Sequence, residues 1–212
     1  MNWKKRSIKD CRLYAILDKD VLVKRSLLNT ARKMLDAGVD IIQYRDKSSD
    51  KKTILKHSLI LKKLLQKSRT IFIINDHVDI ASLVDSDGVH LGQDDLSLGG
   101  ARKLLGPEKI IGISCRGLKQ ALIAQNEGAD YLGLGPVFST PVKKGFSPVG
   151  LEKIREFEKN IRIPYFVIGG INCNNLLRVR SAGAKRAAIC RGLCRAQDIL
   201  KQTRKIRSIL NN

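Results

Sequence analysis

The chain has 212 residues, 43% of them hydrophobic, which predicts a folded protein with one domain over residues 1–212. It has no apolar run of the roughly 18 residues that a membrane span needs, and no apolar core follows its basic first residues, so we expect no membrane partner, no signal peptide and a cytoplasmic location. The formal net charge of +20 favours anionic partners, but only 5% of the residues are aromatic, which makes nucleic-acid binding a distant alternative.

The cysteine pattern argues against a disulfide framework, because the five cysteines are odd in number and scattered. Cys190 and Cys194 are separated by three residues, and no second pair follows them. We therefore expect reduced, buried thiols rather than a metal-thiolate site.

Short apolar runs alternate with longer amphipathic segments along the chain. The predicted strands cover residues 13–17, 41–44, 71–74, 88–91, 110–114, 131–135, 165–168 and 187–190. The predicted helices cover residues 26–37, 50–68, 78–84, 98–105, 117–127, 151–160, 174–182 and 196–210. Apolar strands covered by helices indicate a parallel sheet, and eight alternations predict its closure into a (β/α)8 TIM barrel with short loops.

Candidate site residues stand at the C-terminal ends of the predicted strands or in the loops that follow, at the barrel end where active sites lie. In strand order they are Gln43, Tyr44, Arg45, Asp46 and Lys47; Asn75 and Asp76; Gln93 and Asp95; Ser114; Thr140, Pro141, Val142 and Lys143; Gly169 and Gly170; and Cys190 and Arg191. The longest predicted loop, 136–150, follows the sixth strand, and a loop of this length is often functional.

The carboxylates of Asp76 and Asp95 are candidates for a Mg²⁺ site, because parallel strands bring both to the same end of the sheet. Mg²⁺ typically takes one or two protein carboxylates and completes its shell with water and phosphate oxygens. Arg45 and Lys47 are two residues apart and share a face of the second strand. With Lys143 they predict a site for a polyphosphate.

A second anion site is predicted after strands seven and eight, the usual phosphate site of such barrels. The glycines Gly169 and Gly170 allow backbone N–H groups to approach a phosphate, and the guanidinium of Arg191 can close the same site. Two anion sites on one rim are what an enzyme that joins a diphosphate to a monophosphate needs.

The three histidines give no sign of a hydrolytic nucleophile. We expect His57 on the surface of a helix, His77 at a helix start and His90 as a core residue with its polar atoms satisfied. No Ser-His-Asp order or Cys-His pairing stands out.

Several segments, in order along the chain, resemble those of thiamine phosphate synthase. They are Gln43-Tyr44-Arg45-Asp46-Lys47, Ile74-Asn75-Asp76, residues 88–95 (GVHLGQDD), residues 133–138 (GLGPVF) with Thr140 and Lys143-Lys144, and Ile168-Gly169-Gly170-Ile171. The similarity runs in register over residues 13–198, which makes it specific for the superfamily.

The resemblance implies roles for these residues. Asp76 and Asp95 would hold Mg²⁺, and Gly170 with the residues after strand eight, Cys190 and Arg191, would hold the phosphate of the hydroxyethylthiazole. The aminopyrimidine diphosphate would be held by Gln43, Arg45, Lys47, Asn75, Ser114, Thr140 and Lys143, with Tyr44, Asp46, Pro141 and Val142 beside them. Among these, Arg45, Lys47, Ser114 and Lys143 are the expected catalytic residues.

The family reaction, as the resemblance implies it, releases pyrophosphate and joins the pyrimidine methylene to the thiazole nitrogen. The partners would be two small phosphorylated substrates, with the thiazole either plain or carboxylated. The sequence leaves the oligomeric state open, and a homo-oligomer is among the states it allows.

The chain departs from the family pattern at two positions. Val142 stands where a second threonine is usual, and Arg191 stands where many members have a serine, although an arginine also binds phosphate. A thiazole tautomerase of the same superfamily remains an alternative, but that branch resembles a form with histidine where this chain has Pro136.

Overall fold

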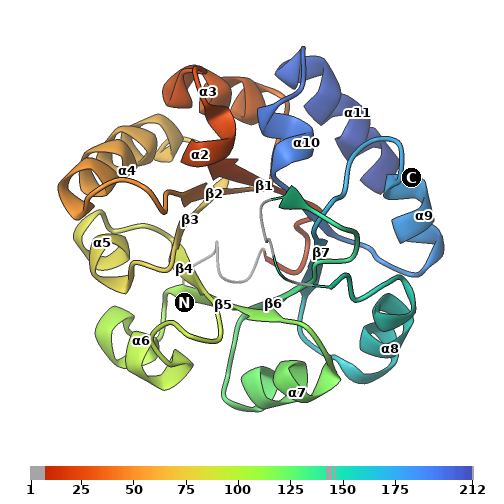
Figure 1. The fold of residues 1–212 in the computed structure, drawn as a ribbon. Coiled ribbons are helices and arrows are strands. Elements are labelled where there is room, and N and C mark those ends of the chain that lie inside the picture. The colour runs from red at the N-terminus through yellow and green to blue at the C-terminus, as the bar shows by residue number, and fades with distance from the viewer. Residues whose placement is uncertain (1–7, 142–144, 146, 212) are drawn as a thin grey trace.

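The structure is a computed structural model that describes residues 8–141, 145 and 147–211. Eight parallel strands close into a barrel in the order β1 to β8, and β8 pairs with β1. The strands are β1 (Leu13–Asp18), β2 (Ile41–Arg45), β3 (Ile71–Asn75), β4 (Gly88–Leu91), β5 (Ile110–Cys115), β6 (Tyr131–Leu134), β7 (Tyr165–Ile168) and β8 (Ala187–Ile189). The predicted (β/α)8 barrel is confirmed (Figure 1).

Helices form a ring outside the strands (Figure 1). They are α2 (Lys19–Leu22), α3 (Leu27–Asp36), α4 (Lys51–Leu65), α5 (Val78–Leu83), α6 (Leu98–Leu105), α7 (Leu118–Asn126), α8 (Glu152–Asn160), α9 (Leu176–Ser181), α10 (Arg191–Cys194) and α11 (Ile199–Asn211). The sequence did not predict α2 and α10, because four residues are too few to show a helical hydrophobic period. Within the described ranges, no helix has the length and apolar character to cross a membrane.

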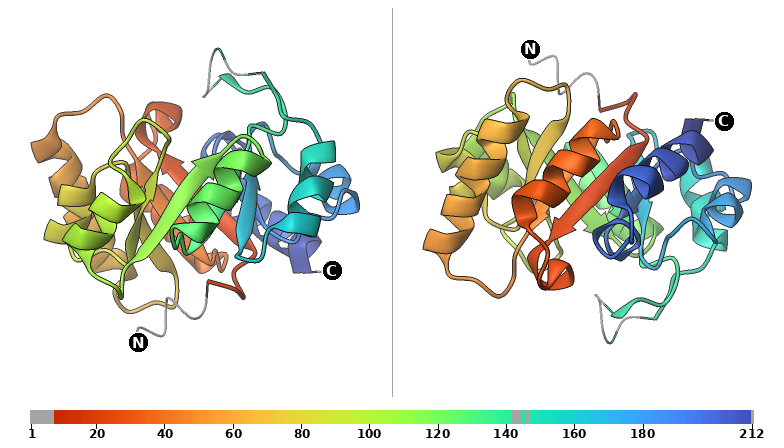
Figure 2. Two further views of the ribbon diagram at one scale, coloured as in Figure 1. Left: turned by 90° about the horizontal axis from the view of Figure 1, so that it is seen from below. Right: turned by 90° about the horizontal axis from the view of Figure 1, so that it is seen from above.

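Side chains alternate along each strand between the barrel interior and the layer beneath the helices. On β1, Tyr14 and Ile16 belong to the interior cluster, whereas Leu13 and Leu17 belong to the outer one. Ile8, from the segment that leads into β1, also packs in the interior cluster. Figure 2 shows this segment and the loop after β6 at opposite ends of the barrel.

Three aspartates join pairs of strands at the end opposite that loop. The Asp40 carboxylate, just before β2, accepts the backbone N–H of Leu13 in β1 at 2.8 Å. The Asp87 carboxylate accepts the N–H of the second residue of β3 at 2.7 Å, and the Asp130 carboxylate accepts that of the second residue of β5 at 2.8 Å. We call these residues the aspartate anchors; they give a physical reason for the acidic residue that recurs before a strand.

The loop between β6 and α8 lies against the start of the loop after β7. The backbone N–H of Val137 donates to the carbonyl of Ile168 at 2.8 Å, and that of Phe138 donates to the carbonyl of Gly169 at 3.1 Å. The chain therefore brings residues 137–141 over the same rim as the glycines that follow β7.

Candidate active site

A cavity of about 470 Å³ opens at the C-terminal ends of the strands. It brings together ten of the predicted site residues, namely Gln43, Arg45, Asn75, Ser114, Thr140, Pro141, Gly169, Gly170, Cys190 and Arg191. Val142 and Lys143 lie outside the described residues, so their predicted roles stay predictions. Five further predicted residues, Tyr44, Asp46, Lys47, Asp76 and Asp95, do not line this cavity.

Arg45 reaches the cavity as part of an ion pair that sequence reasoning missed. Its Nη1 atom lies 2.5 Å from Oδ2 of Asp18, which is fully buried at the end of β1. The other oxygen of Asp18 accepts the backbone N–H groups of Asp20 and Val21 at the start of α2. Asp18 therefore fixes both the short helix and the guanidinium, and its signal in the sequence was an acidic residue directly after an apolar run.

Lys47, Asp76 and Asp95 form a charged cluster beside the cavity. The Lys47 ammonium lies 2.9 Å from the Asp76 carboxylate, and Asp95 accepts the backbone N–H of Gly92 at 2.6 Å. Burial raises the pKa of Asp76, Lys47 opposes that rise, and the neighbouring Asp95 adds to it. The Asp76 backbone is in the left-handed region, with φ of 63°, a conformation that non-glycine residues adopt rarely and that is often associated with function.

The donor set at Asp76 and Asp95 fits Mg²⁺ better than a metal enclosed entirely by protein. Two carboxylates that repel each other leave a place for a cation, and Mg²⁺ needs only one or two of them. Across the part of the chain that the structure describes, no group of three or more His, Cys, Asp or Glu side chains is arranged to hold a metal.

A line of polar side chains crosses the barrel interior, with Gln43, His90 and Ser114 at the cavity wall and two tyrosines beneath them. The Gln43 amide nitrogen donates to the Tyr14 hydroxyl at 2.7 Å, and the hydroxyls of Tyr14 and Tyr131 lie 2.9 Å apart. The ring nitrogens of His90 lie 3.0 Å from the Tyr131 hydroxyl and 2.9 Å from Oγ of Ser114. The polar atoms of His90 are hydrogen-bonded, as expected, but the residue is half-buried and lines the cavity rather than lying in the core. Tyr14 and Tyr131 were missed, because tyrosines in apolar strands look like ordinary core residues.

The glycines after β7 allow two loops to approach each other closely. Gly169 and Gly170 have φ values of 99° and 66°. A Cβ on Gly169 would lie 2.4 Å from Cβ of Pro136, and a Cβ on Gly170 would lie 2.7 Å from Cβ of Phe138. The carbonyl of Gly170 accepts the side-chain amide of Asn175 at 2.9 Å. Only glycine therefore fits at either position, and the backbone of Gly170 stays at the cavity wall.

Two arginines line the cavity beside these glycines. Arg191 was predicted there, whereas Arg195, one helical turn later, was missed because it stands beyond the strand end. Both are exposed. Directly before Arg191, Cys190 interacts with Cys194, which raises the pKa of the Cys190 thiol. Arg191 and Arg195 make this side of the cavity cationic.

Tyr44 and Asp46 point away from the cavity, toward α4. The Tyr44 hydroxyl donates to Oδ2 of Asp46 at 2.7 Å and lies 2.9 Å from Nδ1 of His57. Oδ1 of Asp46 accepts the backbone N–H groups of Ser48 and Ser49. Both residues shape the loop after β2, so their contact with substrate stays a prediction. His57 is half-buried against Tyr44 rather than at the surface, which corrects the expectation from its helical position.

Comparison with known proteins identifies the family. The family model for thiamine monophosphate synthase matches residues 13–193. The chain belongs to this family. Thiamine-phosphate synthase from Shouchella clausii is 44% identical over 193 residues, which cover 91% of this chain and 92% of that protein. The synthase from Lawsonia intracellularis is 41% identical over 202 residues, covering 95% and 93%.

A solved structure supports membership of the thiamine monophosphate synthase family. Thiamine phosphate pyrophosphorylase from Pyrococcus furiosus superposes with a TM-score of 0.86 at 33% identity, covering 99% of this chain and 98% of that one. These matches confirm the resemblance in the sequence. They do not favour the tautomerase or the nucleic-acid alternative.

Proposed function

We propose that this protein is a Mg²⁺-dependent thiamine phosphate synthase. It would couple 4-amino-2-methyl-5-hydroxymethylpyrimidine diphosphate with hydroxyethylthiazole phosphate, plain or carboxylated, to give thiamine phosphate and pyrophosphate. One observation carries the proposal: a single cavity is lined by Arg45, Asn75 and Ser114 from β2, β3 and β5, and by Gly170 and Arg191 from the segments after β7 and β8. Each group of residues offers donors to one phosphorylated substrate. A cytoplasmic location agrees with the free thiols found throughout the described residues.

The diphosphate half of the site would use cations that are already held in place. Arg45 is fixed by Asp18, and Lys47 by Asp76. Asp76 and Asp95 would hold Mg²⁺, which when bound neutralises charge on the leaving pyrophosphate. Groups fixed before the reaction stabilise the charge that develops on the leaving group at little cost in reorganisation.

The coupling step needs no general base from the protein. The bond between the pyrimidine methylene carbon and the diphosphate oxygen breaks, and both electrons leave with pyrophosphate. The lone pair of the thiazole nitrogen then forms the new bond to that carbon. This agrees with His90, whose ring nitrogens are engaged by Tyr131 and Ser114.

The thiazole phosphate would bind where the backbone of Gly170 meets the arginines of the α10 segment. Arg191 supplies a fixed positive charge at the position where many family members have a serine, and Arg195 adds a second. A phosphate monoester near neutral pH carries a charge between −1 and −2, which two guanidinium groups match.

The test replaces the proposed metal ligand without disturbing its backbone. Asparagine also adopts the left-handed conformation, so Asp76→Asn should keep the fold. We expect its rate of thiamine phosphate formation, with both substrates and Mg²⁺, to fall by roughly 100-fold or more. The matched control is Asp79→Asn, three residues later on α5, where the exposed carboxylate pairs with Lys51. Near-normal turnover in Asp76→Asn would contradict the metal assignment.

A further inference from the structure

Five side chains from five strands form one hydrogen-bonded line through the barrel, which we call the polar chain. In order it contains Gln43, Tyr14, Tyr131, His90 and Ser114, with successive distances of 2.7, 2.9, 3.0 and 2.9 Å. Its two ends line the cavity, and so does His90. The two tyrosines lie beneath, at most 2% exposed. The polar chain therefore connects two predicted substrate-binding residues across the barrel.

The direction of every hydrogen bond in the polar chain follows from its first member. The Gln43 amide nitrogen can only donate, so the Tyr14 oxygen accepts. The Tyr14 hydroxyl is buried, and leaving its hydrogen without an acceptor would be costly, so this hydrogen turns to the Tyr131 oxygen 2.9 Å away. The Tyr131 hydrogen then turns to Nδ1 of His90, which must be unprotonated. The proton of a neutral imidazole is then on Nε2, which donates to Oγ of Ser114.

We propose that the polar chain holds the Ser114 hydroxyl as a hydrogen-bond donor to the diphosphate. Because Oγ of Ser114 accepts from His90, its own hydrogen is left to point into the cavity. Tyr14, Tyr131 and His90 are then positioning residues that act through Ser114. The inference rests on the proposed function, since it assigns the diphosphate as the acceptor.

The direction matters because diphosphate oxygens accept hydrogen bonds. A serine whose hydrogen turned toward His90 would present oxygen lone pairs to an anion. With the direction set beforehand, the donor need not reorient when charge develops on the leaving group. Burial raises the pKa of Tyr14 and of Tyr131, so both phenols keep the protons that this arrangement requires. Phe166 packs edge-on against both rings, at 5.2 and 5.7 Å, and limits their movement.

The first measurement is the tautomer of His90 in the free protein. The chain has three histidines, so ¹⁵N NMR of the rings can be assigned with His57→Gln and His77→Gln. We expect the proton of His90 on Nε2 and none on Nδ1. A proton on Nδ1 overturns the inference.

The second measurement uses a variant of Gln43 that should reverse the direction of the hydrogen bonds in the polar chain. Gln43→Glu replaces a donor with a carboxylate of the same shape, so at a pH where ¹³C NMR shows this carboxylate ionised, every hydrogen bond should reverse. We expect the proton of His90 to move to Nδ1. Adding Tyr14→Phe should cut the connection and abolish this shift. Adding Tyr165→Phe to Gln43→Glu should leave the shift unchanged, because the Tyr165 hydroxyl donates to Glu158 in the outer layer and is not part of the polar chain. An unchanged tautomer in Gln43→Glu overturns the inference.

The third measurement asks whether the polar chain acts through Ser114. Ser114→Ala should lower kcat by about 10- to 100-fold, as expected for the loss of one donor to a charged acceptor. Tyr14→Phe should cause a smaller loss of kcat, and none in the Ser114→Ala background. Additive losses would overturn the positioning role. The tautomer of His90 is measured without substrate, so an unexpected tautomer would refute only the role of the polar chain. The proposed function would be refuted by a different result, namely that the wild-type protein does not form thiamine phosphate.

Discussion

Acidic side chains at the rim differ in what surrounds them, and this determines what each carboxylate can do. Asp18 is fully buried, and its oxygens are occupied by Arg45 and by the start of α2. Asp46 is buried as well, and Tyr44 and backbone N–H groups occupy its oxygens. Asp76 instead stands between a lysine and a second carboxylate, which suits it to bind a cation.

The surroundings of Asp46 predict how stability depends on pH. Burial alone would raise its pKa, but hydrogen bonds from Tyr44, Ser49 and Ser48 outweigh burial and hold the pKa below the ordinary 3.8. A carboxyl with a lowered pKa in the folded state stabilises the protein above its unfolded pKa, and this stability is lost as pH falls through the folded pKa. In urea unfolding between about pH 5 and pH 2, we expect Asp46→Asn to lose less unfolding free energy than the wild type.

The control for this prediction is Asp36→Asn, which changes an exposed carboxyl on α3. It should follow the wild-type pH dependence. An equal loss in Asp46→Asn and the wild type would show that Asp46 does not contribute.

Single residues were predictable where their position along the chain carried the signal. Arg45, Asn75 and Ser114 stand at or near strand ends, and all three line the cavity. Tyr14 and Tyr131 stand inside apolar strands, and only the closed barrel brings their hydroxyls together. Sequence reasoning has no access to such contacts, because they join strands far apart in the chain.

At the scale of elements, the aspartate anchors explain how strands pair at the end opposite the cavity. Asp40 is the clearest case, because its carboxylate accepts two backbone N–H groups, those of Arg12 and Leu13. Asp40→Ala would leave both without this acceptor. We expect a loss of about 1–3 kcal/mol in the free energy of unfolding, measured in urea, with kcat unchanged.

Asp36→Ala serves as the matched control, four residues earlier and exposed. It should change the unfolding free energy by less than about 0.5 kcal/mol, as is usual for a surface position. If both variants lost the same stability, the anchor interpretation would be wrong.

The strands and long helices were predictable because each has a hydrophobic period or a continuous apolar run. The elements that were missed have neither. The α2 helix forms because Asp18 caps it, and α10 turns directly out of β8. Both helices contribute to the cavity wall: Asp18 lies directly before α2, and Arg191 is the first residue of α10. The ion pair between Lys47 and Asp76 could not be predicted from the sequence either, because it depends on a left-handed backbone at Asp76.

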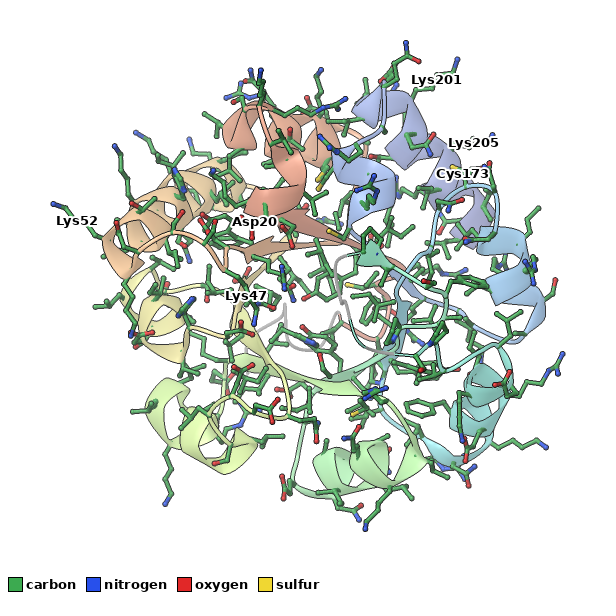
Figure 3. All side chains as sticks on the ribbon, in the orientation of Figure 1. Asp20, Lys47, Lys52, Cys173, Lys201 and Lys205 are labelled. Atoms are coloured by element: carbon green, nitrogen blue, oxygen red, sulfur yellow. The ribbon has the colours of Figure 1, made fainter. Side chains whose placement is uncertain are left out.

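At the scale of the whole molecule, the chain carries a formal net charge of +20. Figure 3 shows Lys52 on α4 and Lys201 on α11 pointing away from the barrel, whereas Lys47 lies inside the ring of helices. Lys52 and Lys201 do not line the cavity, but they add to the positive field that the two proposed anionic substrates would meet.

This charge predicts a salt-dependent rate of substrate capture. Raising ionic strength from about 0.1 M to 1 M shortens the screening length from about 10 Å to about 3 Å. We expect kcat/KM for the diphosphate to fall across this range, with a smaller change in kcat. Lys201→Glu combined with Lys205→Glu should weaken the salt dependence, as seen in initial rates. A kcat/KM that does not change with salt would contradict the prediction.

The aspartate anchors have a consequence for how this enzyme could diverge. They join three pairs of strands at one end of the barrel, while the residues predicted to bind substrate stand at the opposite end, the mouth. A substitution at the mouth, such as the arginine at position 191, leaves every anchor in place. Substitutions at the mouth can therefore change which ligand the protein binds without removing the hydrogen bonds that the aspartate anchors make between strands.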